Sequence, residues 1–184
     1  MPERATSQLL DLHSVITRLP PEEAKFNVRY GMFCQVGRPR GLPAGRLPVT
    51  DSDLTQGFRA VLEPLKFRLA AQSETVFAAA VPPDFRIGAT VTKVEANFCF
   101  PFSGSPLLNV GAPDLAKGNV FMQTVWEVFS VSQGKVVFTQ TTTGAFTAQE
   151  SLPGGVATMF LNVFMENLRN LAAEPAFRAV VVSQ

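Results

Sequence analysis

Two long runs of β-branched and aromatic residues, residues 118–131 and 136–147, follow one another in the second half of this 184-residue chain. Such residues are enriched in β-strands because their side chains pack well on a pleated surface. The runs are separated only by Ser-Gln-Gly-Lys, a short connection whose glycine suits a tight reversal of the chain. The sequence therefore predicts an antiparallel hairpin here.

Apolar residues at helical spacing predict two helices. The first covers residues 52–63, where Thr50 and the acids Asp51 and Asp53 supply an N-cap and first-turn charges, and Pro64 disturbs the end. The second opens at residues 151–153 and stops near Pro175. Its apolar stripe consists of Val156, Met159, Phe160, Val163, Phe164, Leu168 and Leu171. Such a stripe requires an apolar surface to pack on.

Two segments upstream of the hairpin are predicted to be strands. Residues 25–36 alternate between apolar and polar positions, as expected for a strand with one buried face. Residues 84–100 are rich in β-branched and aromatic residues, with Gly88 as a candidate bulge. Each segment contains one of the two cysteines of the chain, Cys34 and Cys99.

Glycine and proline predict loops over residues 37–49 and 101–115, whereas the short apolar segments 66–71 and 74–80 fit either a helix or a strand. Together these elements predict an α+β fold, with a mostly antiparallel or mixed sheet and two principal helices packed on one face.

The length of the chain favours one domain, which we expect over residues 26–184. Residues 1–25 are expected to form an N-terminal arm or a short helix, because they contain one apolar stretch at roughly helical spacing that Pro20 and Pro21 end. That stretch consists of Leu9, Leu10, Leu12, Val15, Ile16 and Leu19.

The charge balance argues against a nucleic-acid partner. Sixteen Lys and Arg face fifteen Asp and Glu, so the net charge of +1 offers no electrostatic surface for a phosphate backbone. The charged fraction of 17% lies below the roughly 25% usual for soluble domains, and Phe occurs sixteen times. Either the core is large, or a partner covers part of the apolar surface.

The sequence predicts no transmembrane segment, because no apolar run approaches the roughly 18 residues needed to span a bilayer. The first twenty residues also lack the continuous apolar region of a secretory signal. Two interpretations remain open: a cytosolic start, or a chain from which a signal or lipid anchor upstream has been removed.

Candidate chemical groups are few, and no catalytic site, cofactor or metal site is predicted. His13 is the single histidine and lies far from both cysteines in the sequence, which gives neither a nucleophile–base pair nor a zinc-ligand spacing. Asp51 and Asp53 are explained as cap residues. The remaining carboxylates that could form a pair are Glu63, Glu74, Glu95 and Glu127. Arg38, Arg40 and Arg46 make the first loop basic, which is typical of a solvated loop.

Trp126 lies in the middle of the first hairpin strand, where alternation places it on the same face as Thr124 and Val128. Packing in the core is the favoured interpretation, and a binding hot spot is the alternative.

The residues alone leave the state of Cys34 and Cys99 open between two buried thiols and a disulfide. A bond between them would close a segment of 65 residues, worth about 4 kcal/mol in the chain-entropy model. Such a bond persists only in an oxidising compartment.

The order of several motifs resembles the amino-terminal domain of proteobacterial envelope proteins that often precede a trypsin-like protease domain. The matching stretches, from about residue 29 to 177, are RYGMFC, LEPLKFRLA, ETVF, FRIGATVTKVEANFC, VWEVFSVSQGKVVFTQTTTG and GGVATMFLNVFMENLRNLAAEPAF. The resemblance implies an exported domain without activity of its own, a bond between Cys34 and Cys99, and a fold akin to the small α/β domains of envelope assembly lipoproteins. The chain departs from that family in showing no export signal and no protease domain.

The leading hypothesis is a non-enzymatic cell-envelope domain, periplasmic or associated with the outer membrane, that binds a protein partner or a second copy of itself. One alternative is a regulatory domain of a trypsin-like hydrolase. Another is a cytoplasmic small-molecule-binding module, with a pocket between the sheet and the last helix lined by Phe160, Phe164 and Trp126.

Overall fold

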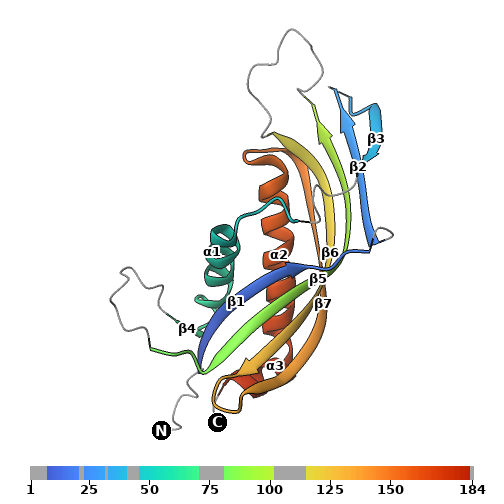
Figure 1. Cartoon of the computed structure of the whole chain (residues 1–184). Helices are drawn as coiled ribbons and strands as arrows, with labels where there is room; N and C mark the ends of the chain where they lie inside the picture. Colours follow the sequence, from blue (N-terminus) through green and yellow to red (C-terminus); the bar gives the residue numbers. More distant parts are fainter. Residues whose placement is uncertain are drawn as a thin grey trace.

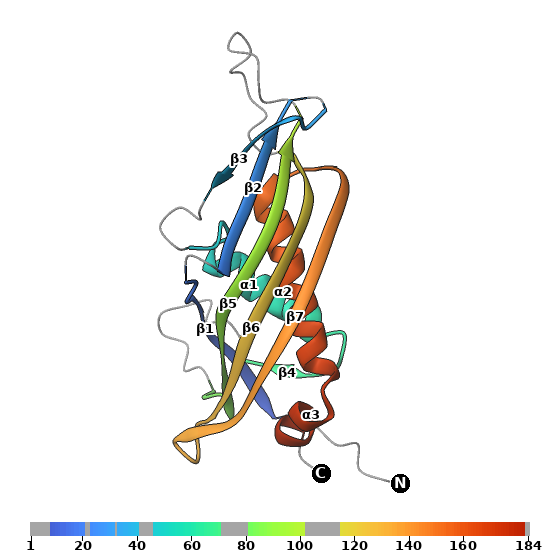
Figure 2. The same cartoon turned by 90° about the vertical axis from the view of Figure 1, so that its right-hand side faces the viewer.

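The computed structural model describes residues 8–20, 23–31, 33–40, 46–70, 81–101 and 115–182. It has an α+β fold in which a strongly curled, mixed sheet of seven strands carries its helices on one face (Figure 1). Turned by 90°, the molecule shows the opposite face of the sheet, which no helix of the described chain covers (Figure 2). The predicted fold class and mixed sheet are thus confirmed, although three helices replace the expected two.

The long strand β5, Phe85–Phe100, organises the sheet. One of its edges pairs along almost its whole length with β6, Ala116–Ser130, in antiparallel order. Its other edge is shared by two strands that both run parallel to it: β1, Leu9–Thr17, pairs with the first half, and β2, Ala24–Tyr30, with the second half. The prediction of a strand over residues 84–100 is confirmed.

The remaining strands extend the sheet outward. β4, Arg68–Leu69, pairs with β1, and β3, Val36–Arg40, pairs with β2. On the other side, β7, Lys135–Leu152, pairs with β6. Because β6 and β7 are joined by the turn at residues 131–134, the predicted hairpin is confirmed.

The arm or short helix expected over residues 1–25 is wrong for its apolar stretch. Residues 9–17 form strand β1 inside the sheet, and Leu10 is completely buried there. The partner of β1 is β5, more than 70 residues away in the sequence. Pairing with so distant a strand decides the conformation here, and the roughly helical spacing of the leucines does not.

The strand predicted over residues 25–36 is divided in two. β2 ends at Tyr30, and a turn follows in which Gly31 and Cys34 have positive φ. β3 begins at Val36, the last residue of the predicted strand, and continues over residues 37–40, where a loop was expected. Residues 41–45 of that loop, and the segments 74–80 and 102–114, lie outside the described residues.

Gly88 lies opposite a bulge and is not itself bulged. The register of β1 against β5 shifts between Leu12 and Ser14, so His13 is the extra residue on β1 facing Gly88. A second shift lies between Val91 and Lys93 of β5. These irregularities bend the strands and contribute to the curl of the sheet.

The helices are α1, Asp51–Leu62, α2, Gly155–Ala173, and α3, Pro175–Val181. The first two match the predicted helices, and six members of the predicted α2 stripe are completely buried. Sequence patterns did not reveal α3, because Pro175 also fits the end of α2. Here Pro175 occupies the first turn of a new helix, a position that proline tolerates well.

Two apolar clusters fill the space between sheet and helices. One surrounds Trp126, Phe164 and Phe177, and the other surrounds Phe26, Phe98 and Phe160. None of the helices in the described ranges is long and apolar enough to cross a membrane.

The start of α1 is held by a capping box, in which Thr50 accepts from the Asp53 N–H while Asp53 accepts from the Thr50 N–H. We expect Thr50→Ala to lower the free energy of unfolding by about 1 kcal/mol, measured by urea denaturation. Ser52→Ala, two residues further along in the first turn of α1, is the control and should change the free energy of unfolding far less. Equal effects of the two variants would contradict this role.

The Thr50 hydroxyl and backbone N–H both donate to the Asp53 carboxylate and hold its pKa below the usual value. Since the pKa is lower in the folded state, this stabilising contribution is present at neutral pH. It is lost as the pH falls through the lowered pKa of Asp53.

Candidate functional site

The two cysteines are joined in a disulfide, with their Cα atoms 5.5 Å apart. Cys99 lies in β5 and is buried, whereas Cys34 lies in the turn after β2 and not inside a strand. Both sulfur atoms are therefore used in a covalent bond. In this state neither cysteine can act as a nucleophile or as a thiolate ligand.

The disulfide ties the turn after β2 to the end of β5. Cys34 has a φ of 55°, a left-handed conformation that costs a non-glycine residue energy, and its N–H donates to the Gly31 carbonyl at 2.9 Å. The Gly31 N–H in turn donates to the Phe100 carbonyl at 3.1 Å. The Tyr30 and Phe100 rings stack beside it, 5.7 Å apart. The covalent bond thus holds together two chain segments that meet at one end of the sheet.

Trp126 packs in the core, as predicted, and shares its buried face with Thr124 and Val128. Its ring lies 5.7 Å from that of Phe164 on α2. Its Nε1–H donates to the Thr142 hydroxyl at 2.8 Å, and that hydroxyl lies 3.0 Å from Asn167 Oδ1, to which it can donate. The Trp126 side chain thus has the hydrogen-bond acceptor that a buried indole needs.

Asn167 completes this buried polar cluster, which we call the Trp126–Thr142–Asn167 cluster. Its Nδ2 donates to the carbonyls of Met122 and Val163, both at 3.1 Å. A Cβ added at Gly144 would lie 2.8 to 3.0 Å from Asn167 and the Val163 carbonyl, so only glycine allows α2 this close to β7. The cluster fixes α2 on the sheet and is closed to solvent.

The pocket predicted between the sheet and the last helix is therefore wrong. Phe160, Phe164 and Trp126 have no exposed surface and pack against other core residues. Phe160 belongs to the cluster around Phe26 and Phe98, with ring centroids 6.2 and 5.9 Å away, respectively. These side chains fill the space that a ligand would need.

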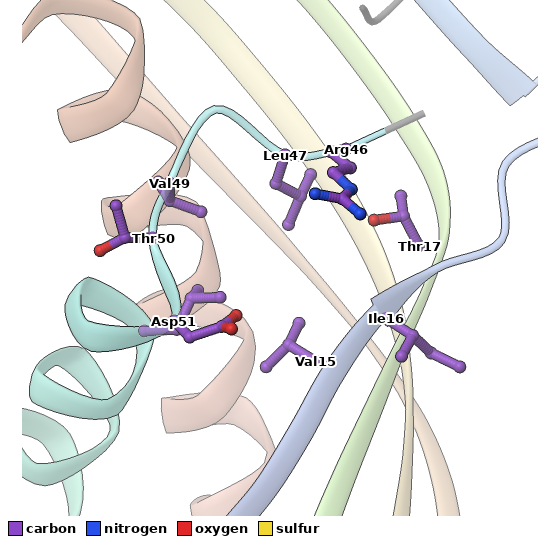
Figure 3. Close-up of a pocket in the computed structure, with 9 residues that line it drawn as sticks. Val15, Ile16, Thr17, Arg46, Leu47, Val49, Thr50 and Asp51 are labelled. Carbon is purple, nitrogen blue, oxygen red and sulfur yellow. The ribbon is translucent and has the colours of Figure 1, made fainter. Parts of the chain in front are cut away.

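An open groove of about 700 Å³ lies instead between the end of β1 and the segment that leads into α1 (Figure 3). Its apolar lining comes from Val15, Leu47, Val49 and Leu54. At one end the Arg46 side chain points toward Thr17, and at the other Asp51 starts α1. The groove brings together segments that are some 30 residues apart, and for that reason sequence patterns did not reveal it.

His13 lies on the outer face of the sheet, in a shallow depression that it shares with Arg86, Glu127 and Phe129. Ser14, the residue after His13, pairs with Gly88 of β5. Gly88 is eleven residues from Cys99 along β5, which corresponds to about 35 Å at the rise of a strand. The structure thus keeps the histidine far from both cysteines.

The carboxylates considered as candidates are spread over the molecule. Asp51 and Asp53 lie in the first turn of α1, and Glu63 pairs with Arg59 at 2.8 Å. Glu95 and Glu23 flank Lys93 and raise its pKa. Glu74 lies outside the described residues. In the described ranges no three potential metal ligands gather at one place.

The three arginines of the first predicted loop have different positions. Arg38 and Arg40 belong to the edge strand β3, whereas Arg46 lies at the groove.

No family model matches the sequence, and no curated protein does. Among solved structures, the chain resembles protein XCC0632 from Xanthomonas campestris, described by family model DUF330, at 17% identity over 93% of this chain and 86% of that one, with a TM-score of 0.41. It also resembles hypothetical protein CT253 from Chlamydia trachomatis, at 12% identity over 85% of this chain and 94% of that one, with a TM-score of 0.38. A third similar structure is the PelC dodecamer from Paraburkholderia phytofirmans, at 13% identity over 93% of this chain and 95% of that one, with a TM-score of 0.36. These weak likenesses bring no function to this chain, and the link to a trypsin-like protease stays a prediction.

Proposed function

We propose that this chain is a non-enzymatic domain of the cell envelope, periplasmic or associated with the outer membrane, that acts by binding protein. The observation that carries the proposal is the disulfide between Cys34 and Cys99. Disulfides of this structural kind form and persist in oxidising compartments, and are rare in the cytosol.

The uncovered face of the sheet supports a role in binding. β6 carries Phe121, Val125 and Phe129 on that face, all half-buried without any helix above them. Polar and charged side chains such as Glu127 stand between them. A surface that mixes partly exposed apolar side chains with polar groups is suited to a protein partner.

The positions of the reactive side chains support a non-enzymatic role. Both thiols are used in the disulfide, and the buried polar side chains of Trp126, Thr142 and Asn167 are hydrogen-bonded in one cluster. His13 stands on the opposite face of the sheet from that cluster. The disulfide and the cluster thus have structural roles, and His13 lies apart from both.

The proposal is tested by producing the chain with and without an export signal and comparing its resistance to protease. We expect the exported wild type to be resistant and the Cys34→Ser/Cys99→Ser variant to be cleaved in the same compartment. The wild type made in a reducing cytosol should behave like that variant. If the exported variant resists protease as well as the wild type, the bond has no role in the envelope, and the proposal is wrong.

The groove beside Val15 and Leu47 favours a second candidate function, the binding of a small ligand with both apolar and polar groups. Native mass spectrometry of the purified chain would detect a retained ligand. Val15→Lys, which would place a charge in the groove, should abolish retention if this function is correct.

A further inference from the structure

The outer edge of β7 is the longest open edge of the sheet in the described part of the chain. β7 has 18 residues and pairs only with β6. The opposite side of the sheet ends in β4, with two residues, and β3, with five. A long open strand is a template for pairing with another chain, because its outer N–H and C=O groups have no ladder partner.

The outward-facing backbone groups of β7 can be identified from two side-chain contacts. Asn170 of α2 donates to the Thr143 carbonyl at 2.7 Å, and Gln140 donates to the Thr141 carbonyl at 3.2 Å. These carbonyls therefore point away from β6. The register with β6 is unbroken from Phe138 to Ala148, so the same alternation places the N–H and C=O of Ala145 and Thr147 on the open edge.

The two edges of the sheet are protected very differently. β3 contains Pro39, which has no backbone N–H to donate and so discourages pairing with another strand. In β7, residues 136–149 contain no charged residue and no proline. On the outer face of this stretch the side chains are small, with Thr143, Ala145 and Thr147 in succession. The open edge of β7 thus lacks the usual protection.

We propose that the open edge of β7 pairs with β7 of a second copy of this chain, antiparallel and centred near Ala145. Self-pairing places Ala145 opposite its own copy and sets residues at equal distances on either side of it opposite each other. Because residues 136–149 contain no charged residue, this register brings no like charges together. In this register Thr143 of each copy lies opposite Thr147 of the other, so the pairing extends over residues 143–147 and displaces Asn170 from the Thr143 carbonyl. This inference rests on the proposed function, and it names the partner as a second copy.

The test uses opposite charges at the centre of the proposed pairing. In Ala145→Lys two lysines would face each other across the two-fold axis, and in Ala145→Glu two glutamates would do so. For the disulfide-bonded wild type, sedimentation equilibrium should show a monomer–dimer equilibrium. We expect each variant to raise the dissociation constant about tenfold or more, and an equimolar mixture of the two to restore the dimer.

Ala60→Lys, at an exposed position of α1, is the matched control and should leave the dissociation constant unchanged. Circular dichroism verifies that both Ala145 variants are folded, and recovery in the mixture shows the same independently. A wild type that stays monomeric up to millimolar concentration overturns the inference, as does a dimer that the two variants leave intact.

The two proposals fail in different ways. If the wild type is monomeric while the exported protein still needs its disulfide for protease resistance, self-pairing is wrong and the proposed function stands. If the disulfide has no effect in the exported protein, the proposed function is wrong whatever the oligomeric state.

Discussion

Trp126→Ala is expected to lower the free energy of unfolding by about 4 kcal/mol, the largest effect of any single substitution proposed for this chain. Trp126 has no exposed surface, so the variant leaves a cavity between the sheet and α2. It also removes the hydrogen bond to Thr142 and the contact with the Phe164 ring. Urea denaturation measures the change. It is followed by circular dichroism because Trp126 is the only tryptophan, and the variant therefore has no tryptophan fluorescence.

A double-mutant cycle separates the hydrogen bond from the packing. Trp126→Phe keeps most of the ring but removes the Nε1–H donor, and Thr142→Val keeps the shape of the side chain but removes the acceptor. Each variant should cost about 1 to 3 kcal/mol, because it leaves a buried polar group without its partner. The double variant should cost less than the sum of the two. Strict additivity would contradict a direct bond between these side chains.

Removing the disulfide is the second large effect. We expect Cys34→Ser/Cys99→Ser to lower the free energy of unfolding by about 4 kcal/mol, because the bond joins residues 65 positions apart and restricts the unfolded chain. The wild type treated with reductant should lose the same amount. The measurement is denaturation of oxidised wild type, reduced wild type and the double variant under identical conditions.

The double variant treated with reductant is the control, and it should not change. The loss should also be visible locally. Without the bond nothing covalent holds Cys34 in its left-handed conformation, so amide exchange at Gly31 and Cys34 should accelerate most. A variant as stable as the oxidised wild type would show that the bond does not contribute to the fold.

Elements defined by neighbouring residues could be predicted from the sequence. Thr50 and Asp53 predict the start of helix α1. A four-residue connection between two strand-like runs predicts the β6–β7 hairpin. The buried face of Trp126 follows from alternation along one strand. In each case the decisive residues lie within a few positions of one another.

Elements defined by distant partners could not be predicted. β1 is a strand because β5 lies beside it, although its leucines are spaced roughly as in a helix. α3 follows Pro175, which ends one helix and begins the next, so the same residue fits a stop and a start.

The candidate sites follow the same division. The sequence singled out Cys34 and Cys99 but left their pairing open, since only the register of β2 with β5 places them together. Asn167 has a polar side chain on the buried side of α2, and nothing in the sequence tells that it meets Thr142. The groove joins β1 to the start of α1, and the open edge of β7 depends on the strand order.

We propose that this domain works with the Cys34–Cys99 bond closed, in an oxidising compartment. The most direct measurement is the intact mass of the protein taken from the cells that make it naturally, alkylated after unfolding, with and without prior reduction. We expect no alkylation without reductant and two alkylated cysteines after reduction. Two alkylated cysteines without reductant would show that the thiols are free in the cell, and would contradict both the bond and the envelope location.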